Sequence, residues 1–208
     1  KADCFYQTNL LKPKFLGEER LEIYGNKYQY IIDSGKPFIV SESAPFREYN
    51  DYLRFAWSSY GWADAICNNE NVGPERWNKF EKSTGINIVD WKSQGDDIII
   101  MGQKEGDSAL THLYNEHNTF YDWVINVINQ IRKYSDRRII IRPHPRNLSR
   151  GVKLSTRIVN DPDMKNIIIS DNLTKGGNQG GKGLDTDLNS AYCVITYNSL
   201  SAVEAVTR

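Results

Sequence analysis

Apolar residues recur at helical spacing in two stretches of the chain. In the second half they stand at i, i+3, i+4, i+7, i+8 and i+11, and predict a helix over 118–134: Phe120, Trp123, Val124, Val127, Ile128 and Ile131. In the first half a similar pattern predicts an amphipathic helix over 45–60, from Phe46, Tyr49, Leu53, Ala56, Trp57 and Tyr60.

Short unbroken apolar runs mark the strands of the second half, because a strand covered on both faces has no polar alternation. They predict strands at 97–101, 138–142, 166–169 and 192–197, with further helices at 184–190 and 199–208. Strands that alternate with helices favour an α/β fold with a doubly wound parallel sheet. Ligands bind such sheets beyond the carboxyl ends of the strands.

The first half is less regular and richer in turn residues. We expect a short strand at 37–40, a short helix that begins near Arg76 and Trp77, and a close of this half at Gly95. The domain boundary is therefore predicted between a smaller, irregular α/β region, 1–95, and a doubly wound α/β domain, 96–208. The start at Lys1 and the stop inside a predicted helix lead us to expect a longer natural protein.

Composition narrows the classes of function. The 208 residues hold 26 Lys and Arg against 26 Asp and Glu, so net charge offers no argument for binding DNA or a membrane surface. No apolar stretch is long enough to span a bilayer and no signal peptide is evident, so we expect a cytoplasmic protein. Three widely spaced cysteines predict reduced thiols.

The first candidate motif is Arg142-Pro143-His144-Pro145-Arg146, directly after a predicted strand. The prolines restrict the backbone around His144, and Arg142 and Arg146 are suited to a phosphate or diphosphate. His144 could donate a hydrogen bond or a proton to a leaving phosphate oxygen. The alternative is a proline-terminated strand with a surface histidine and solvated arginines.

The second motif is the strand-to-helix segment Asn198–Glu204. Backbone N–H groups at the start of a helix, together with the hydroxyls of Ser199 and Ser201, are suited to a phosphate. Glu204 could accept hydrogen bonds from a ribose diol. Ordinary capping by Asn198 or Ser199, with Glu204 as a first-turn acid, is the alternative.

Two further segments carry candidate carboxylates. Gly102 and Gln103 open a loop whose glycines permit close approach of a ligand, and Glu105 and Asp107 follow in the same loop as possible acids or bases. Glu42 stands at the end of a predicted strand before a predicted helix and could serve as a catalytic carboxylate. A plain polar turn and a capping segment are the respective alternatives.

Two features predict no site. His112 and His117 are spaced by five and do not share a helical face, so we predict no metal site. The glycine-rich run 176–183 lacks the phosphate-loop pattern and is predicted to be a loop.

In this order, the Gly-Gln-x-x-Gly-Asp-Ser loop, the Arg-Pro-His-Pro strand end and the Asn-Ser-x-Ser-x-x-Glu-Ala helix start resemble the C-terminal domain of HP-motif GT-B glycosyltransferases. That family includes capsule Kdo transferases, bacterial sialyltransferases and phage-encoded members, and the resemblance covers roughly 96–208. It implies a Rossmann-like nucleotide-sugar-binding domain over 96–208, an acceptor-side region over 1–95, and a place in the cytoplasm of a bacterial or phage-infected host cell. It implies that His144, Ser199 and Ser201 contact the donor phosphate and that Glu204 binds the ribose. The match for the family's catalytic carboxylate stays open between Glu42 and Asp107.

The resemblance implies transfer of a sugar from a nucleotide sugar, with UDP or CMP as the expected nucleotide, to a hydroxyl acceptor. That acceptor would be a surface saccharide or a hydroxymethylated base in phage DNA. No cofactor and no metal are expected beyond the donor itself. The rival hypotheses are a CDP-glycerol-type phosphotransferase, a non-catalytic nucleotide- or saccharide-binding module, and a DNA-binding structural protein.

Overall fold

The structure is a computed structural model that describes residues 4–8, 26–43, 45–46, 52–58, 70–110, 112–144, 164–171 and 183–207. Contacts divide the chain into two compact units. The first is Lys1–Ala44 with Tyr49–Thr84, and the second is Pro45–Glu48 with Gly85–Arg208.

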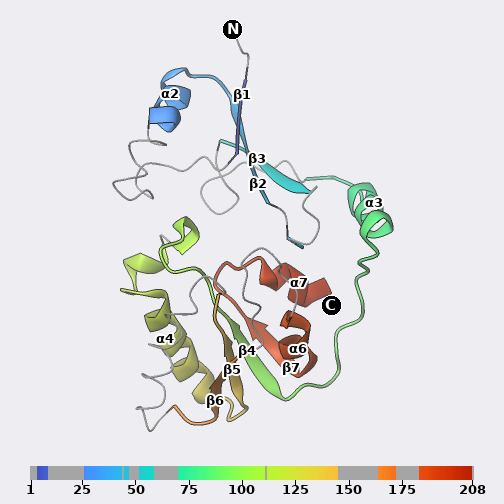
Figure 1. Ribbon diagram of the computed structural model, residues 1–208, viewed down its shortest axis with the longest axis vertical. Helices are drawn as coiled ribbons and strands as arrows, with labels where there is room; N and C mark the ends of the chain where they lie inside the picture. Colours follow the sequence, from blue (N-terminus) through green and yellow to red (C-terminus); the bar gives the residue numbers. More distant parts are fainter. Residues whose placement is uncertain are drawn as a thin grey trace. The chain divides into compact units, whose positions relative to one another are not determined.

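The first unit contains a three-stranded sheet in the order β1-β2-β3 (Figure 1). Its elements are β1 (Phe5–Thr8), α2 (Asn26–Asp33), β2 (Phe38–Ser43), β3 (Leu53–Trp57) and α3 (Glu75–Thr84). Strand β2 pairs in parallel with β1 and antiparallel with β3. The predicted strand at 37–40 and the predicted short helix near Arg76 are both confirmed.

The predicted helix over 45–60 is wrong for 53–57, which form strand β3. Leu53, Phe55 and Trp57 are exposed while Ala56 is buried, so the segment alternates with a period close to two. Apolar residues at 53, 56 and 57 also fit a helix, and only pairing with β2 separates the two interpretations.

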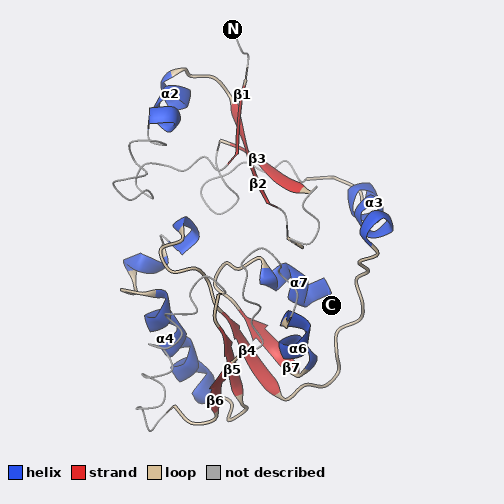
Figure 2. Cartoon of the chain, viewed as in Figure 1, coloured by secondary structure: helices blue, strands red, loops and turns tan. Residues whose placement is uncertain are grey.

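The second unit contains a four-stranded parallel sheet in the order β6-β5-β4-β7 (Figures 1 and 2). Its elements are β4 (Asp97–Met101), the 3₁₀ turns η3 (Ser108–Leu110) and η4 (Leu113–Asn115), α4 (Phe120–Arg132), β5 (Ile139–Arg142), β6 (Ile167–Ile169), α6 (Leu184–Asn189), β7 (Ala191–Ile195) and α7 (Ser201–Thr207). All four strands and three helices predicted for this half are confirmed within a few residues.

Alternate residues of β4 and β5 enter two separate clusters on opposite faces of this sheet. One cluster joins Ile98, Ile100 and Ile141 to the buried side of α4, and the other joins Ile99 and Ile140 to residues of α6 and α7. Figure 1 shows α4 on one side of the strands and α6 with α7 on the other. Helices therefore cover both faces, which explains the unbroken apolar runs and confirms the predicted α/β fold with a parallel sheet.

Strand order decides where a ligand site can form. From β4 the chain proceeds to β5 and β6 on one side, and it then crosses to β7 on the other side of β4. The carboxyl ends of β4 and β7 are therefore neighbours whose outgoing connections lead to opposite faces. This is the topological switch point of an open parallel sheet, where a crevice forms between two loops.

Candidate functional site

The candidate site lies where β5, β4 and β7 end, and we refer to residues 102–107, 143–144 and 196–201 together as the carboxyl edge. The loops after β4 and β7 touch directly, because the side-chain oxygen of Gln103 accepts a hydrogen bond from the backbone N–H of Asn198 at 3.2 Å. Gln103 is only 7% exposed although it is polar. It thus connects the two sides of the switch point.

Gly102 brings the third strand end to the same place. Its N–H donates to the carbonyl oxygen of Arg142 at 2.6 Å. A Cβ at position 102 would lie 2.5 Å from that oxygen and 2.6 Å from the backbone nitrogen of His144. Glycine is therefore required here by close packing of two strand ends, rather than by close approach of a ligand alone.

The rest of the loop after β4 is fastened to the start of α4. Glu105 accepts hydrogen bonds from the Tyr114 hydroxyl at 3.0 Å and from the backbone N–H of Phe120 at 3.3 Å. The Tyr114 hydroxyl in turn accepts from the N–H of Gly106 at 2.9 Å. Burial, with Glu105 nearby, raises the pKa of Tyr114 to about 12, so this hydroxyl stays protonated.

The first turn of α4 is also capped by its own residues. Thr119 and Asp122 form a capping box in which each side chain accepts from the other's backbone N–H. Together with Glu105, this places a carboxylate of the protein where a substrate anion would otherwise meet the helix dipole. The start of α4 is therefore poorly suited to a donor phosphate.

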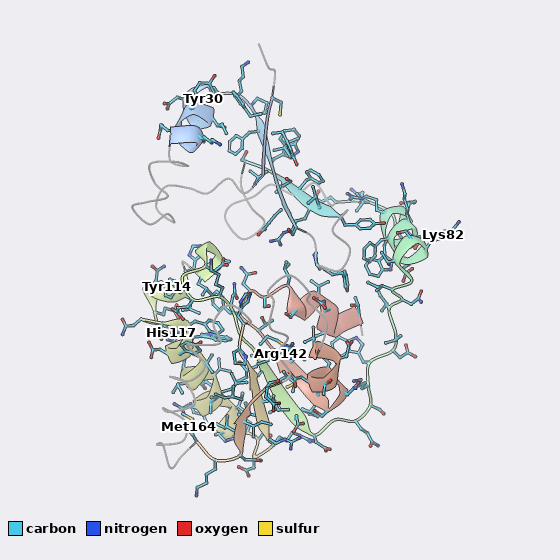
Figure 3. All side chains as sticks on the ribbon, in the orientation of Figure 1. Tyr30, Lys82, Tyr114, His117, Arg142 and Met164 are labelled. Carbon is cyan, nitrogen blue, oxygen red and sulfur yellow. The ribbon has the colours of Figure 1, made fainter. Side chains whose placement is uncertain are left out.

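Arg142 lies in a buried ion pair at the end of β5. Its Nη1 donates to Asp187 Oδ2 at 2.5 Å and to the carbonyl of Gly183 at 3.1 Å, beside helix α6 (Figure 3). The hydroxyl of Ser170, just past β6, donates to the same carboxylate at 2.7 and 3.0 Å. Asp187 is 3% exposed and Arg142 is 9% exposed.

Asp187 is not among the site residues predicted from the sequence. A signal for it exists in the short helix 184–189, where Leu184 and Leu188 define the buried face. Residue 187 falls on that same face, so a carboxylate there must meet a buried cationic or hydroxyl partner. The identity of that partner follows only from the parallel alignment of β5 and β6.

The β7–α7 connection holds its hydroxyl groups close to its backbone. The N–H of Ser199 donates to Thr196 Oγ1 at 3.1 Å, and the N–H of Ser201 donates to Ser199 Oγ at 3.3 Å. The two serine hydroxyls are 3.2 Å apart. Glu204 follows in the first turn of α7 and is 5% exposed.

The remaining predicted site residues fall in different places. His144 is half-buried at the carboxyl edge. Asp107 belongs to the same edge, and its Oδ1 accepts from the N–H of Ala109 at 3.0 Å at the start of η3. Glu42 belongs to the first unit, on β2, where it forms a cross-strand ion pair with Arg54. Arg146 lies outside the described residues.

The second unit thus brings Gly102, Gln103, Asp107, Arg142, His144, Asn198, Ser199, Ser201 and Glu204 to the ends of adjacent strands or into the turns that follow them. These residues come from three motifs that are far apart in the sequence. Their hydroxyl, amide and imidazole groups suit a polar, anionic ligand that lies across β5, β4 and β7.

Comparison of the chain with models of protein families, with curated proteins and with solved structures found no match in any of the three. Among the described residues, no three His, Cys, Asp or Glu side chains cluster in a way that could hold a metal ion. Within the same residues, no helix has the length and apolar character needed to cross a membrane.

Proposed function

We propose that this chain is a GT-B-like glycosyltransferase that moves a sugar from a nucleotide sugar to a hydroxyl acceptor. One observation carries the proposal. The three motifs that resemble HP-motif glycosyltransferases follow β4, β5 and β7, which are adjacent in the sheet, so all three meet at the carboxyl edge. In open α/β sheets this edge is the usual place for a nucleotide.

In the proposed reaction the acceptor hydroxyl loses its proton to a carboxylate, and its oxygen attacks the anomeric carbon. The bond between that carbon and the phosphate oxygen breaks, and the nucleotide leaves with the electron pair. His144 stabilises the phosphate oxygen on which negative charge develops, by a hydrogen bond or by proton donation. The hydroxyls of Ser199 and Ser201 bind the same phosphate.

Arg142 has a different part in this proposal from the one its sequence position predicts. Asp187 lies 2.5 Å from its guanidinium and offsets its charge. We therefore assign Arg142 mainly to holding the end of β5, with His144 two residues further along as the group that contacts the donor. The general base remains either Asp107, which shares the carboxyl edge, or Glu42, which pairs with Arg54 in the first unit.

The first test is a thermal-shift screen with UDP, CMP, GDP, CDP and their sugar conjugates, on the unaltered chain and on His144→Ala. A nucleotide at 100 times its Kd adds about 2.7 kcal/mol, or several degrees at this chain length. We expect a shift with one nucleotide, and its loss or marked reduction in His144→Ala. His112→Ala is the matched control, because His112 is exposed outside the carboxyl edge.

Turnover gives the second readout. His144→Ala should lower the rate of transfer by about 10²-fold, as is typical when a general acid or an oxyanion partner is removed. Equal rates in His144→Ala and His112→Ala would refute the role of His144. Mass spectrometry of the product separates sugar transfer from transfer of a glycerol phosphate, and a shift without any product would favour a binding module.

A further inference from the structure

The sheet of the first unit has two chemically different faces. The strand register places Tyr6, Ile39 and Trp57 in one row and Ser41 and Phe55 in the next, all on the same face. We refer to this surface, which also includes Ser43 and Leu53, as the aromatic face. On the opposite face of the sheet the side chains of Phe38, Val40 and Ala56 are buried.

Large apolar side chains are exposed along the aromatic face. Tyr6 and Phe55 are each 57% exposed, Leu53 is 44% exposed and Trp57 is 36% exposed. Single exposed apolar residues are common, whereas a contiguous group with polar neighbours marks a binding surface. Tyr6 on β1 and the three residues on β3 lie on the same face across the intervening strand β2, and they form a group of this kind.

The rings are held in place by contacts within the face. The Tyr6 hydroxyl and Ser41 Oγ are hydrogen-bonded at 2.8 Å, although Ser41 is fully buried beneath the surface. The Tyr6 and Phe55 ring centroids are 6.4 Å apart, with 37° between the ring planes. Phe55 and Trp57 are two residues apart on one strand, so their side chains point to the same side. Their Cα atoms are about 6.8 Å apart along the strand.

Among the described residues of this face there is no charged side chain. Arg54 and Glu42 alternate to the opposite face and pair with each other. A nucleic acid would need cations along its phosphates, and an acidic or basic peptide would need opposite charges. An uncharged surface of rings and hydroxyls instead matches a ligand that is itself uncharged and presents both C–H groups and hydroxyls.

We propose that the aromatic face binds a neutral saccharide chain, with the C–H-rich faces of successive sugar rings stacked on Phe55, Trp57 and Tyr6. Hydroxyls of the sugar would bond to the Tyr6 and Ser43 hydroxyls at the margins. This proposal goes beyond the proposed function, because saccharide binding at the aromatic face does not depend on which ligand binds at the carboxyl edge.

The test is isothermal titration of the full chain, without nucleotide, with neutral hexasaccharides of glucose, xylose and N-acetylglucosamine. Phe55→Ala and Trp57→Ala should each weaken binding of the best hexasaccharide at least tenfold, whereas Phe55→Trp should retain it. Trp91→Ala and Tyr134→Ala are matched controls, because these aromatic residues are 82% and 88% exposed but lie in the second unit. Both control variants should bind as the unaltered chain does.

The proposal would be overturned if no hexasaccharide binds, or if Trp91→Ala and Phe55→Ala lose the same affinity for the best hexasaccharide. It would also be overturned if the face binds a single-stranded oligothymidylate instead of a saccharide, in a salt-sensitive way that Phe55→Ala abolishes. The last result would make the face a nucleic-acid surface. Because no nucleotide is present, a negative result here leaves the thermal-shift test of the carboxyl edge unaffected.

Discussion

Two Arg–carboxylate pairs in this protein have the same chemistry and different burial. Side chains of Arg142 and Asp187 are 10% and 2% exposed, against 38% and 26% for Arg54 and Glu42. Removal of one partner from a buried pair leaves the other charge uncompensated, whereas water compensates an exposed one. Burial therefore decides how much each carboxylate contributes to stability.

We accordingly expect Asp187→Asn to lower the free energy of unfolding by about 3 kcal/mol or more, and Glu42→Gln to lower it by less than about 1 kcal/mol. Both substitutions remove one charge and keep the shape of the side chain. Urea unfolding of the two variants beside the unaltered chain measures the difference. Equal losses would mean that the Arg142 site is open to water.

Position 102 permits a test of close packing at the carboxyl edge. Gly102→Ala would push a methyl group against the backbone of Arg142 and His144, where contacts of 2.5 and 2.6 Å cannot be relieved by a side-chain rotation. We expect a loss of about 1–3 kcal/mol, seen as a lower melting temperature.

Gly106→Asn is the control for that variant. Gly106 has open space around it and a φ of +74°, which asparagine tolerates better than other residues do. Its cost should be about 1 kcal/mol or less. A Gly102→Ala variant as stable as Gly106→Asn would show that a methyl group fits between the two strand ends, and would contradict the prediction.

At the scale of elements, the amino ends of β4 and β5 are joined by a third ion pair of an arginine and a carboxylate. Arg138 donates from Nε and Nη2 to the two carboxylate oxygens of Asp97, both at 2.7 Å, and Asp97 is fully buried. The hydrogen bonds from Arg138 hold the pKa of Asp97 below its ordinary value, against the opposing effect of burial.

The lowered pKa predicts how stability depends on pH. In the unfolded chain the Asp97 carboxyl has a pKa of about 3.9. The ion pair therefore contributes its full stability above that pH, and this contribution is lost as the pH falls through the lower pKa of the folded protein. The difference in unfolding free energy between the unaltered chain and Asp97→Asn should therefore shrink from pH 6 to pH 2. A constant difference between pH 6 and pH 2 would contradict the prediction.

Elements of the second unit are predicted from the sequence because each has one dominant period. The stripe through Phe120, Val124 and Ile128 repeats over thirteen helical residues, and Thr119 with Asp122 marks its start. Strand β3 is the contrary case, since five residues fit both a helical and an alternating pattern. A short element of this kind takes the structure that its partner strand β2 allows.

At the scale of the whole molecule, each of the two units has its own buried residues. Val40 belongs to the first unit with Ile31 and Phe38, and Val124 belongs to the second with Ile100 and Ile128. Units with separate cores can open separately, because loss of one core leaves the contacts of the other intact.

Val40→Ala and Val124→Ala are therefore a matched pair, each costing about 2 kcal/mol. Hydrogen exchange followed by mass spectrometry should show faster exchange in β1, β2 and β3 for Val40→Ala only. Faster exchange in β4, β5 and α4 should follow from Val124→Ala only. If either variant increases exchange in both units together, the chain unfolds as one cooperative body.

Sequence by itself determined the α/β class of the second unit, its strands and helices, and the segments that carry polar groups at strand ends. These follow from local periodicity and from residues such as proline that act on the neighbouring backbone. Tertiary structure alone decided that β7 lies beside β4, that Gln103 reaches Asn198, and that Arg142 pairs with Asp187. These contacts join residues 45 to 95 positions apart, and their partners are selected by strand order and by the need to pair buried polar groups, neither of which a local pattern contains.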